Sequence, residues 1–152
     1  MFDSDICLHK IDKSTFNKHI INKKNLAFLI CDYFNRYKNG GFISTIIKSN
    51  GKKKVSIVDD KSFLFTFMDQ VPNKYEIKED KINEPIFHLY ENWNKKLFSF
   101  GNDEFVLNKD MDLISQTSNE TIFDYKGIDY PFVETKSSVK KFVVIQMKES
   151  TK

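Results

Sequence analysis

Two cysteines are the residues of this chain best suited to redox or nucleophilic chemistry. Cys7 lies two residues before His9, so on a strand both side chains would point to one face, an arrangement that favours a reactive thiolate. Cys31 ends an apolar stretch, which is typical of a small buried hydrophobe. A thiol-dependent antioxidant enzyme using Cys7 or Cys31 is therefore one candidate function. Neither cysteine belongs to a CxxC motif, so we expect reduced thiols and a cytoplasmic protein.

The histidines do not have the spacing of a metal site. No two of His9, His19 and His88 lie at ligand spacing, whereas a closed zinc site needs four convergent ligands. We expect His19 on a helix and His88 in a strand to be surface or hydrogen-bonded residues. The sequence predicts no structural metal and no cofactor.

Acidic residues occur in three neighbouring pairs, which could share acid and base roles if burial separated their pKa values. Each pair falls at an expected turn or in a charged loop, so we expect solvated side chains. The pairs are Asp59/Asp60, Glu79/Asp80 and Asp103/Glu104. The chain also lacks a GxSxG elbow and a phosphate-binding GK[ST] loop. We therefore assign no catalytic, cofactor-binding or metal residue and expect a binding or regulatory domain.

A basic cluster offers another alternative. Lys52, Lys53 and Lys54 follow a turn signal and would form a basic tip able to bind an anionic surface weakly. Arg36 is the only arginine among 24 basic residues, so the bidentate forks that recognise guanine and phosphate are almost absent. Net charge is only +3, and we expect no specific nucleic-acid partner.

The stretch 62–68, SFLFTFM, is the strongest strand signal. An extended backbone places Phe63, Phe65 and Phe67 on one face and mostly apolar residues on the other. Apolar residues on both faces predict an inner strand covered on both sides. Phe65→Asp is then expected to unfold the domain by burying an unpaired charge.

Other elements follow from similar patterns. We expect a helix over 14–23 capped by Ser14 or Thr15, a turn over 35–41 in which 39–41 supply the positive-φ residues, a two-residue hairpin at 49–51, an exposed excursion over 70–85 and a polar loop over 109–119. The remaining expected strands are 26–34, 41–48, 53–58, 86–90, 96–100, 104–107, 120–125 and 141–147. We expect a loop at 91–94 and a turn at 101–103 to join 86–90, 96–100 and 104–107 as two hairpins.

This pattern predicts a mainly β chain of the α+β class, built as a two-sheet antiparallel β-sandwich with short flanking helices. The 152 residues fit one domain, 1–148, with a frayed tail at 149–152. No apolar run approaches the roughly 20 residues that span a bilayer, and the polar start lacks a signal-peptide core. We expect a soluble protein.

Six segments in order resemble the TLDc domain family, and the opening MFDSD does so too. They are FNKHIINKKNLAFLI, NGGFIS, DDKSFLFTF, KLFSFGNDEFVL, NETIFDYKGI and KKFVVIQM, and together they span residues 1 to 147. The resemblance implies a two-sheet sandwich with small flanking helices. It also implies a stand-alone domain without carried-over catalytic residues.

TLDc proteins are associated with protection against oxidative damage, and several bind the vacuolar proton-pumping ATPase and regulate its assembly. The resemblance therefore implies a non-catalytic protein-interaction domain with a role in oxidation resistance or vacuolar ATPase regulation. The family's glycine-rich turn is represented here only by Gly101-Asn102-Asp103. The cysteine that commonly precedes its Thr-Phe element is absent near Thr121, so the resemblance carries over no cysteine chemistry.

Overall fold

The computed structural model describes residues 1–4, 12–32, 38–68, 71–91, 95–115, 121–128, 132 and 136–149. Its helices are α1 (Lys13–Ile20) and the 3-10 helix η2 (Glu79–Lys81). Its strands are β1 (Phe2–Asp3), β2 (Leu26–Asp32), β3 (Lys38–Ile43), β4 (Lys54–Ile57), β5 (Phe63–Met68), β6 (Val71–Glu76), β7 (Phe87–Tyr90), β8 (Lys96–Phe100), β9 (Phe105–Asn108), β10 (Asp112–Ser115) and β11 (Lys136–Gln146). The fold is mainly β, as predicted.

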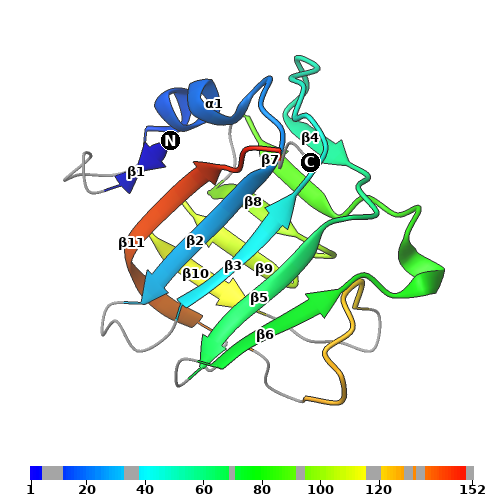
Figure 1. Ribbon diagram of the computed structural model, residues 1–152. Coiled ribbons are helices and arrows are strands. Elements are labelled where there is room, and N and C mark those ends of the chain that lie inside the picture. Colours follow the sequence, from blue (N-terminus) through cyan, green and yellow to red (C-terminus); the bar gives the residue numbers. More distant parts are fainter. Residues whose placement is uncertain are drawn as a thin grey trace.

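The strands form one antiparallel sheet that folds over itself. Its order is β4-β7-β8-β9-β10-β11-β2-β3-β5-β6, and β1 pairs with β11. Figure 1 shows β11, β2, β3, β5 and β6 in front of the other strands. We call these five strands the front layer and β4, β7, β8, β9 and β10 the back layer. The layers are joined through β11, which pairs with β10 at 136–138 and with β2 from Val139 onward. The pairing with β2 has a register shift between Val139 and Lys141.

Phenylalanine rings fill the space between the two layers. Phe28 of β2 lies 4.9 Å from Phe98 and 5.3 Å from Phe87, measured between ring centroids, and all three rings are fully buried. Phe142 of β11 lies 5.5 Å from Phe98. Tilted and edge-on pairs of this kind suit the ring quadrupole. The core therefore uses much of the chain's high phenylalanine content.

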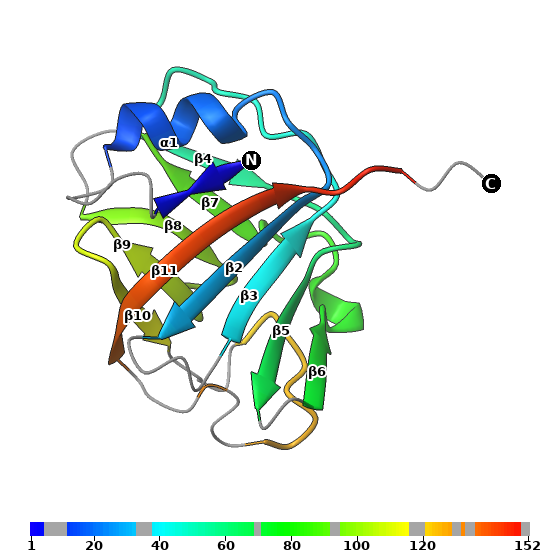
Figure 2. The same cartoon turned by 60° about the vertical axis from the view of Figure 1, so that its left-hand side comes forward.

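Helix α1 covers one end of the layers (Figure 2). Its Phe16 and Ile20 are fully buried, as the helical spacing predicted, and the Phe16 ring lies 5.6 Å from Phe142. The predicted N-cap at Ser14 or Thr15 is wrong. The cap is Asp12, whose carboxylate accepts the backbone N–H groups of both residues at 3.2 Å.

The turn predicted over 35–41 is wrong in its last part, because Gly40 and Gly41 lie within β3, and residues 35–37 lie outside the described part of the chain. A Cβ atom on Gly41 would overlap the Phe100 ring, and one on Gly40 would overlap the Phe28 carbonyl oxygen of β2 and lie 2.5 Å from the Phe65 ring. Both glycines therefore permit close packing of aromatic rings on opposite faces of the strand. The sequence signal was the same as for a turn, since glycine serves both purposes.

The hairpin predicted at 49–51 does not join neighbouring strands. β3 pairs with β2 and β5, whereas β4 pairs with β7 in the back layer. The segment between β3 and β4 therefore crosses from one layer to the other. In contrast, the predicted hairpins between β7 and β8 and between β8 and β9 are confirmed.

Two segments predicted to be irregular contain strands. β6 lies in the predicted excursion. Tyr75 is its one fully buried residue, so the strand shows little alternation of apolar and polar residues in the sequence. β10 lies in the predicted polar loop and pairs with β9 and β11. The strand predicted at 120–125 is reduced, within the described part, to one isolated bridge between Ile77 and Phe123.

Candidate functional site

The outer face of the front layer carries apolar side chains on neighbouring strands. Leu26, Phe28 and Ile30 of β2 point into the core, so the residues between them point outward. The pairing register aligns the outward positions in three rows across β11, β2, β3, β5 and β6. The rows are Ile145–Ala27–Phe42–Phe63–Glu76, Val143–Leu29–Gly40–Phe65–Lys74 and Lys141–Cys31–Lys38–Phe67–Pro72.

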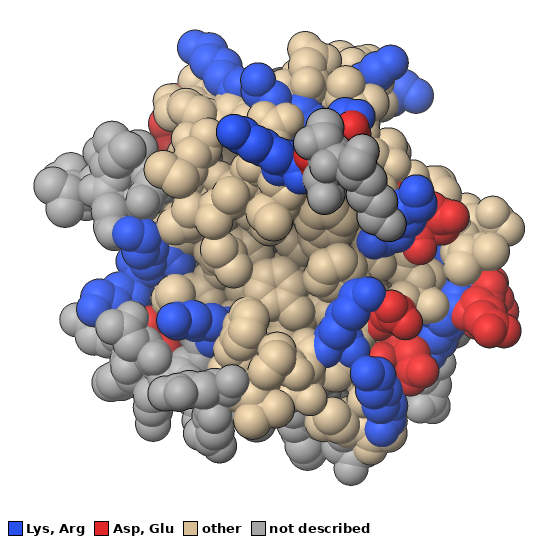
Figure 3. Space-filling model, in the orientation of Figure 1, with Lys and Arg blue, Asp and Glu red and all other residues tan. Residues whose placement is uncertain are grey.

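We call the apolar part of this surface the aromatic face. It consists of Phe42, Phe63, Phe65 and Phe67 together with Ala27, Leu29, Val143 and Ile145. All eight side chains are partly exposed, and Phe67 is 36% exposed. Figure 3 views this side of the molecule: residues other than Lys, Arg, Asp and Glu occupy its centre, and lysines lie around them, with acidic residues among the lysines on the right of the view. An apolar surface with a charged border is typical of an interaction site.

The four phenylalanines form a continuous ladder. The ring centroids of Phe42 and Phe63 are 5.1 Å apart in a stacked pair across β3 and β5. Along β5, Phe63 and Phe65 are 6.2 Å apart, and Phe65 and Phe67 are 5.8 Å apart. Because the Phe65 ring lies over Gly40, the ladder is held against the sheet. These contacts limit the rotamers of the rings, which favours a preformed binding surface.

The expectation that 62–68 is covered on both faces is therefore wrong, and so is the argument that Phe65→Asp would bury an unpaired charge. Leu64 and Thr66 are fully buried, but Phe63 and Phe65 on the opposite face are only partly buried. Only the edge strand β6 lies beyond β5 in the front layer. Alternation identified the two faces correctly. It does not specify whether the second face is covered by the chain itself.

The charges around the aromatic face are unevenly paired. Lys74 Nζ lies 4.6 Å from the Phe63 ring centroid and 2.6 Å from a Glu76 carboxylate oxygen. The hydrogen bond from Lys74 lowers the pKa of Glu76. Lys38 is exposed, and no carboxylate among the described residues lies within ion-pair distance of it. One end of the face therefore presents positive charge.

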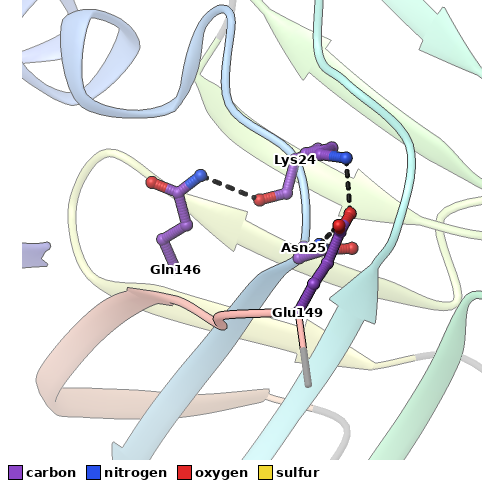
Figure 4. Close-up of polar contacts among 4 residues, drawn as sticks. All are labelled: Lys24, Asn25, Gln146 and Glu149. Atoms are coloured by element: carbon purple, nitrogen blue, oxygen red, sulfur yellow. Dashed lines mark hydrogen bonds and ion pairs between the residues drawn. The ribbon is translucent and has the colours of Figure 1, made fainter. Parts of the chain in front are cut away.

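Contacts from the end of β11 close another border of this face (Figure 4). The Glu149 carboxylate lies 2.5 Å from Lys24 Nζ, and Gln146 donates to the Lys24 carbonyl at 3.3 Å. The Met147 N–H donates to the Asn25 carbonyl at 2.7 Å and extends the pairing between β11 and β2. The lysine at this border is thus paired, unlike Lys38.

Cys31 lies on the same outer surface. It is partly exposed and stands across from Lys141 on one side and Lys38 on the other, so the expectation of a buried hydrophobe is wrong. Cys7 and His9 lie outside the described residues. The structure therefore brings a thiol and two lysines to one surface row, which sequence spacing did not reveal.

Asp59 is not the solvated turn residue that its position predicted. It is 3% exposed, and its carboxylate accepts the backbone N–H groups of Ser44 at 2.5 Å, Thr45 at 3.1 Å and Lys61 at 3.2 Å. Its neighbour Asp60 is exposed. Asp59 therefore holds the chain where it leaves β3, which is a structural role.

Glu104 is likewise buried, at 2% exposed, against the prediction of a solvated pair with Asp103. Its carboxylate accepts the Tyr125 hydroxyl at 2.8 Å and the N–H groups of Ile122 and Phe123. Burial raises the pKa of Glu104 despite these donors. It ties the segment 121–125 to the turn between β8 and β9. Glu79 and Asp80 are exposed, as predicted.

His88 belongs to a polar cluster on the back layer. Its Nδ1 lies 2.9 Å from Ser56 Oγ, and burial, followed by the charge of Lys54, lowers the pKa of His88 to about 4. The charge of Asp103, followed by the Gly101 backbone, opposes this lowering of the pKa. His88 is thus the hydrogen-bonded residue that we expected. His19 is exposed, with Nδ1 2.7 Å from the Thr15 carbonyl oxygen.

The same cluster includes Tyr90, whose hydroxyl lies 3.2 Å from both Ser99 Oγ and an Asp103 carboxylate oxygen. Burial raises the pKa of Tyr90. Lys54 and Lys96 lie 5.6 Å and 5.4 Å from its ring centroid, and Lys96 also pairs with Asp103. Lys54 of the predicted basic tip therefore lies near the aromatic ring of Tyr90, which is distant from it in the sequence. Lys52 and Lys53 are exposed, as expected.

No family model matches the chain, and a search of curated proteins finds no match. Among the described residues, no helix has the length and apolarity needed to cross a membrane. Within the same residues, no three His, Cys, Asp or Glu side chains are grouped as a metal ion would require.

Proposed function

We propose that this chain is a non-catalytic protein-binding domain of the TLDc type that acts through its aromatic face. One observation carries the proposal: Phe63, Phe65 and Phe67 form a partly exposed ladder on a sheet face bordered by lysines. Apolar surface of this kind is costly to leave in water, and its burial against a partner is favourable by roughly 25 cal/mol per Å². Aromatic side chains are also the usual anchors of protein interfaces.

The resemblance to the TLDc family supplies the partner class. Under this proposal the domain contacts subunits of a vacuolar proton-pumping ATPase and contributes to oxidation resistance. Lys38, which has no carboxylate within ion-pair distance among the described residues, favours an acidic group on the partner, because complementary charge speeds and orients association.

Crosslinking in a native extract tests the proposal with two matched variants. Phe67→Ser removes an exposed ring from the aromatic face. Val71→Ser is the control, because Val71 is 60% exposed and alternates with the outward Pro72, so it points to the other side of β6. Wild type and Val71→Ser should retain the same proteins, and Phe67→Ser should lose them while keeping its circular dichroism spectrum.

Two results would count against parts of the proposal. If Phe67→Ser retains the same proteins as wild type, the aromatic face is not the binding surface. If ATPase subunits are never recovered, with or without nucleotide, that partner is wrong and the binding function remains.

A second candidate function rests on Cys31, which stands between Lys38 and Lys141 on the outer surface. Neighbouring ammonium groups favour a thiolate, the reactive form in peroxide chemistry. Alkylation rates measured across pH in Cys7→Ser and Cys31→Ser test each thiol separately. A thiol that titrates no lower than the free value of about 8.5 would remove the basis for this activity.

A further inference from the structure

The spacing of the phenylalanine ladder specifies what kind of segment could cover it. The ring centroids along β5 are 6.2 Å and 5.8 Å apart. A helix rises 1.5 Å per residue, so side chains four residues apart recur every 6 Å or so on one side. Apolar side chains at such positions of a helix would therefore meet Phe63, Phe65 and Phe67 in turn.

Backbone hydrogen bonding favours a helix over an extended segment. A strand laid on the face of a sheet cannot pair with it, because the sheet's N–H and C=O groups point along its plane. Such a strand would leave its own backbone groups unpaired on an apolar surface. A helix satisfies these groups internally, so it can bury one side chain face without this loss.

The size of the aromatic face also favours a single helix over a second folded domain. Five strands about 4.8 Å apart span roughly 19 Å, and the three rows cover about 13 Å along the strands. The area of a rectangle with these two sides is well below the roughly 800 Å² that each partner of a stable protein interface buries. A helix of three turns, about 16 Å long and 10–12 Å wide, fits this surface.

The lysines around the aromatic face indicate at which end of the phenylalanine ladder an acidic residue of the bound segment would lie. Lys24 is paired with Glu149, and Lys74 with Glu76. Lys38 is directly across from Phe67 at the other end of the ladder and has no carboxylate partner among the described residues. An acidic side chain near Phe67 would therefore gain an ion pair.

From this geometry we infer that the aromatic face binds one amphipathic helix of a partner protein. The helix is about three turns long, places apolar residues four apart on Phe63, Phe65 and Phe67, and carries an acidic residue next to Lys38. This inference rests on the proposed function, because it names the element that the binding face recognises.

A random peptide library tests the inference and does not require the partner to be identified. Peptides of 16 residues displayed on phage are selected on wild-type protein, and enriched sequences are synthesised with a fluorophore for anisotropy titration. Enriched peptides should carry Leu, Ile, Met or Phe at i, i+4 and i+7 or i+8, with Asp or Glu at one end. Their helicity by circular dichroism should rise on binding.

Variants locate the bound peptide. Phe67→Ser should weaken binding at least tenfold, and Val71→Ser should change it less than twofold. Lys38→Glu should weaken binding about fivefold, and a peptide whose acidic residue is replaced by lysine should recover that loss. Lys53→Glu is the charge control, since Lys53 is exposed in the segment leading to β4 of the back layer.

Several results would overturn the inference: no enrichment, peptides without the helical pattern, or affinities unchanged by Phe67→Ser. Dimerisation of the protein alone, or binding to phosphatidylserine vesicles, that is abolished by Phe67→Ser would assign the face to another occupant. If native partners depend on Phe67 but no helical peptide does, this inference fails and the proposed function stands. If native partners do not depend on Phe67, the proposed function fails.

Discussion

Replacing His88 with glutamine should make the fold less sensitive to acid. His88 is 7% exposed, and its Nδ1 forms a hydrogen bond of 2.9 Å with Ser56 Oγ. Burial and the nearby Lys54 charge lower its folded-state pKa to about 4, whereas an unfolded histidine titrates near 6.5. The folded protein therefore holds a neutral imidazole at pH values where the unfolded chain binds a proton.

The sign and size of the effect follow from this difference. Between about pH 6.5 and 4 the unfolded state binds more protons, so the free energy of unfolding falls as the pH falls. The stabilisation is fully present above pH 6.5. The two pKa values correspond to a total loss of about 3 kcal/mol, of which about 2 kcal/mol is lost by pH 5.

Urea denaturation at pH 7.5, 6, 5 and 4.5 measures this loss. For wild type, 2 kcal/mol or so moves the urea midpoint by roughly 1 M between pH 7.5 and 5. His88→Gln should have a lower free energy of unfolding at pH 7.5, and its urea midpoint should shift by roughly 1 M less than that of wild type between pH 7.5 and 5. His19→Gln, which alters an exposed histidine, should follow wild type. Parallel wild-type and His88→Gln curves across this range would refute the reasoning.

Three further predictions concern packing in the core and buried hydrogen bonds. Phe28→Ala should lower the free energy of unfolding by about 3–5 kcal/mol, because its ring is fully buried, and Phe67→Ala by less than about 1 kcal/mol; urea denaturation compares them. Gly41→Ala sets a methyl group against a buried ring and should cost about 1–3 kcal/mol, measured as a melting temperature lowered by roughly 3–10 °C. Glu104→Ala leaves two buried amides of the segment 121–125 without their acceptor and should cost about 3–5 kcal/mol; faster exchange of these amides by NMR checks the cause.

Short-range patterns predicted the parts of the fold that depend on neighbours in the chain. The spacing of Phe16 and Ile20 identified the buried side of α1. The turn at Gly101 placed the hairpin between β8 and β9. Period-two alternation identified β5, because successive side chains of a strand point to opposite faces. The strands expected at 26–34 and 141–147 overlap β2 and the pairing part of β11.

The candidate site could not be predicted in this way. Alternation in 62–68 separated the phenylalanine side from the Leu64 side, but both sides are apolar and only the packing of distant strands chose which one is buried. The burial of Asp59 and Glu104 similarly depends on donors from 44–45 and 121–125. Turn residues of the same type are solvated or buried according to what folds over them.

The amino-acid sequence by itself determined that the chain is mainly β, with Phe63, Phe65 and Phe67 on one side of a strand. Tertiary structure alone decided that β3 and β6 flank that strand, that Gly40 lies beneath the Phe65 ring, and that these aromatic rings remain accessible. The physical reason is that side-chain direction is a local property of the backbone, whereas burial depends on surfaces brought together from remote parts of the chain.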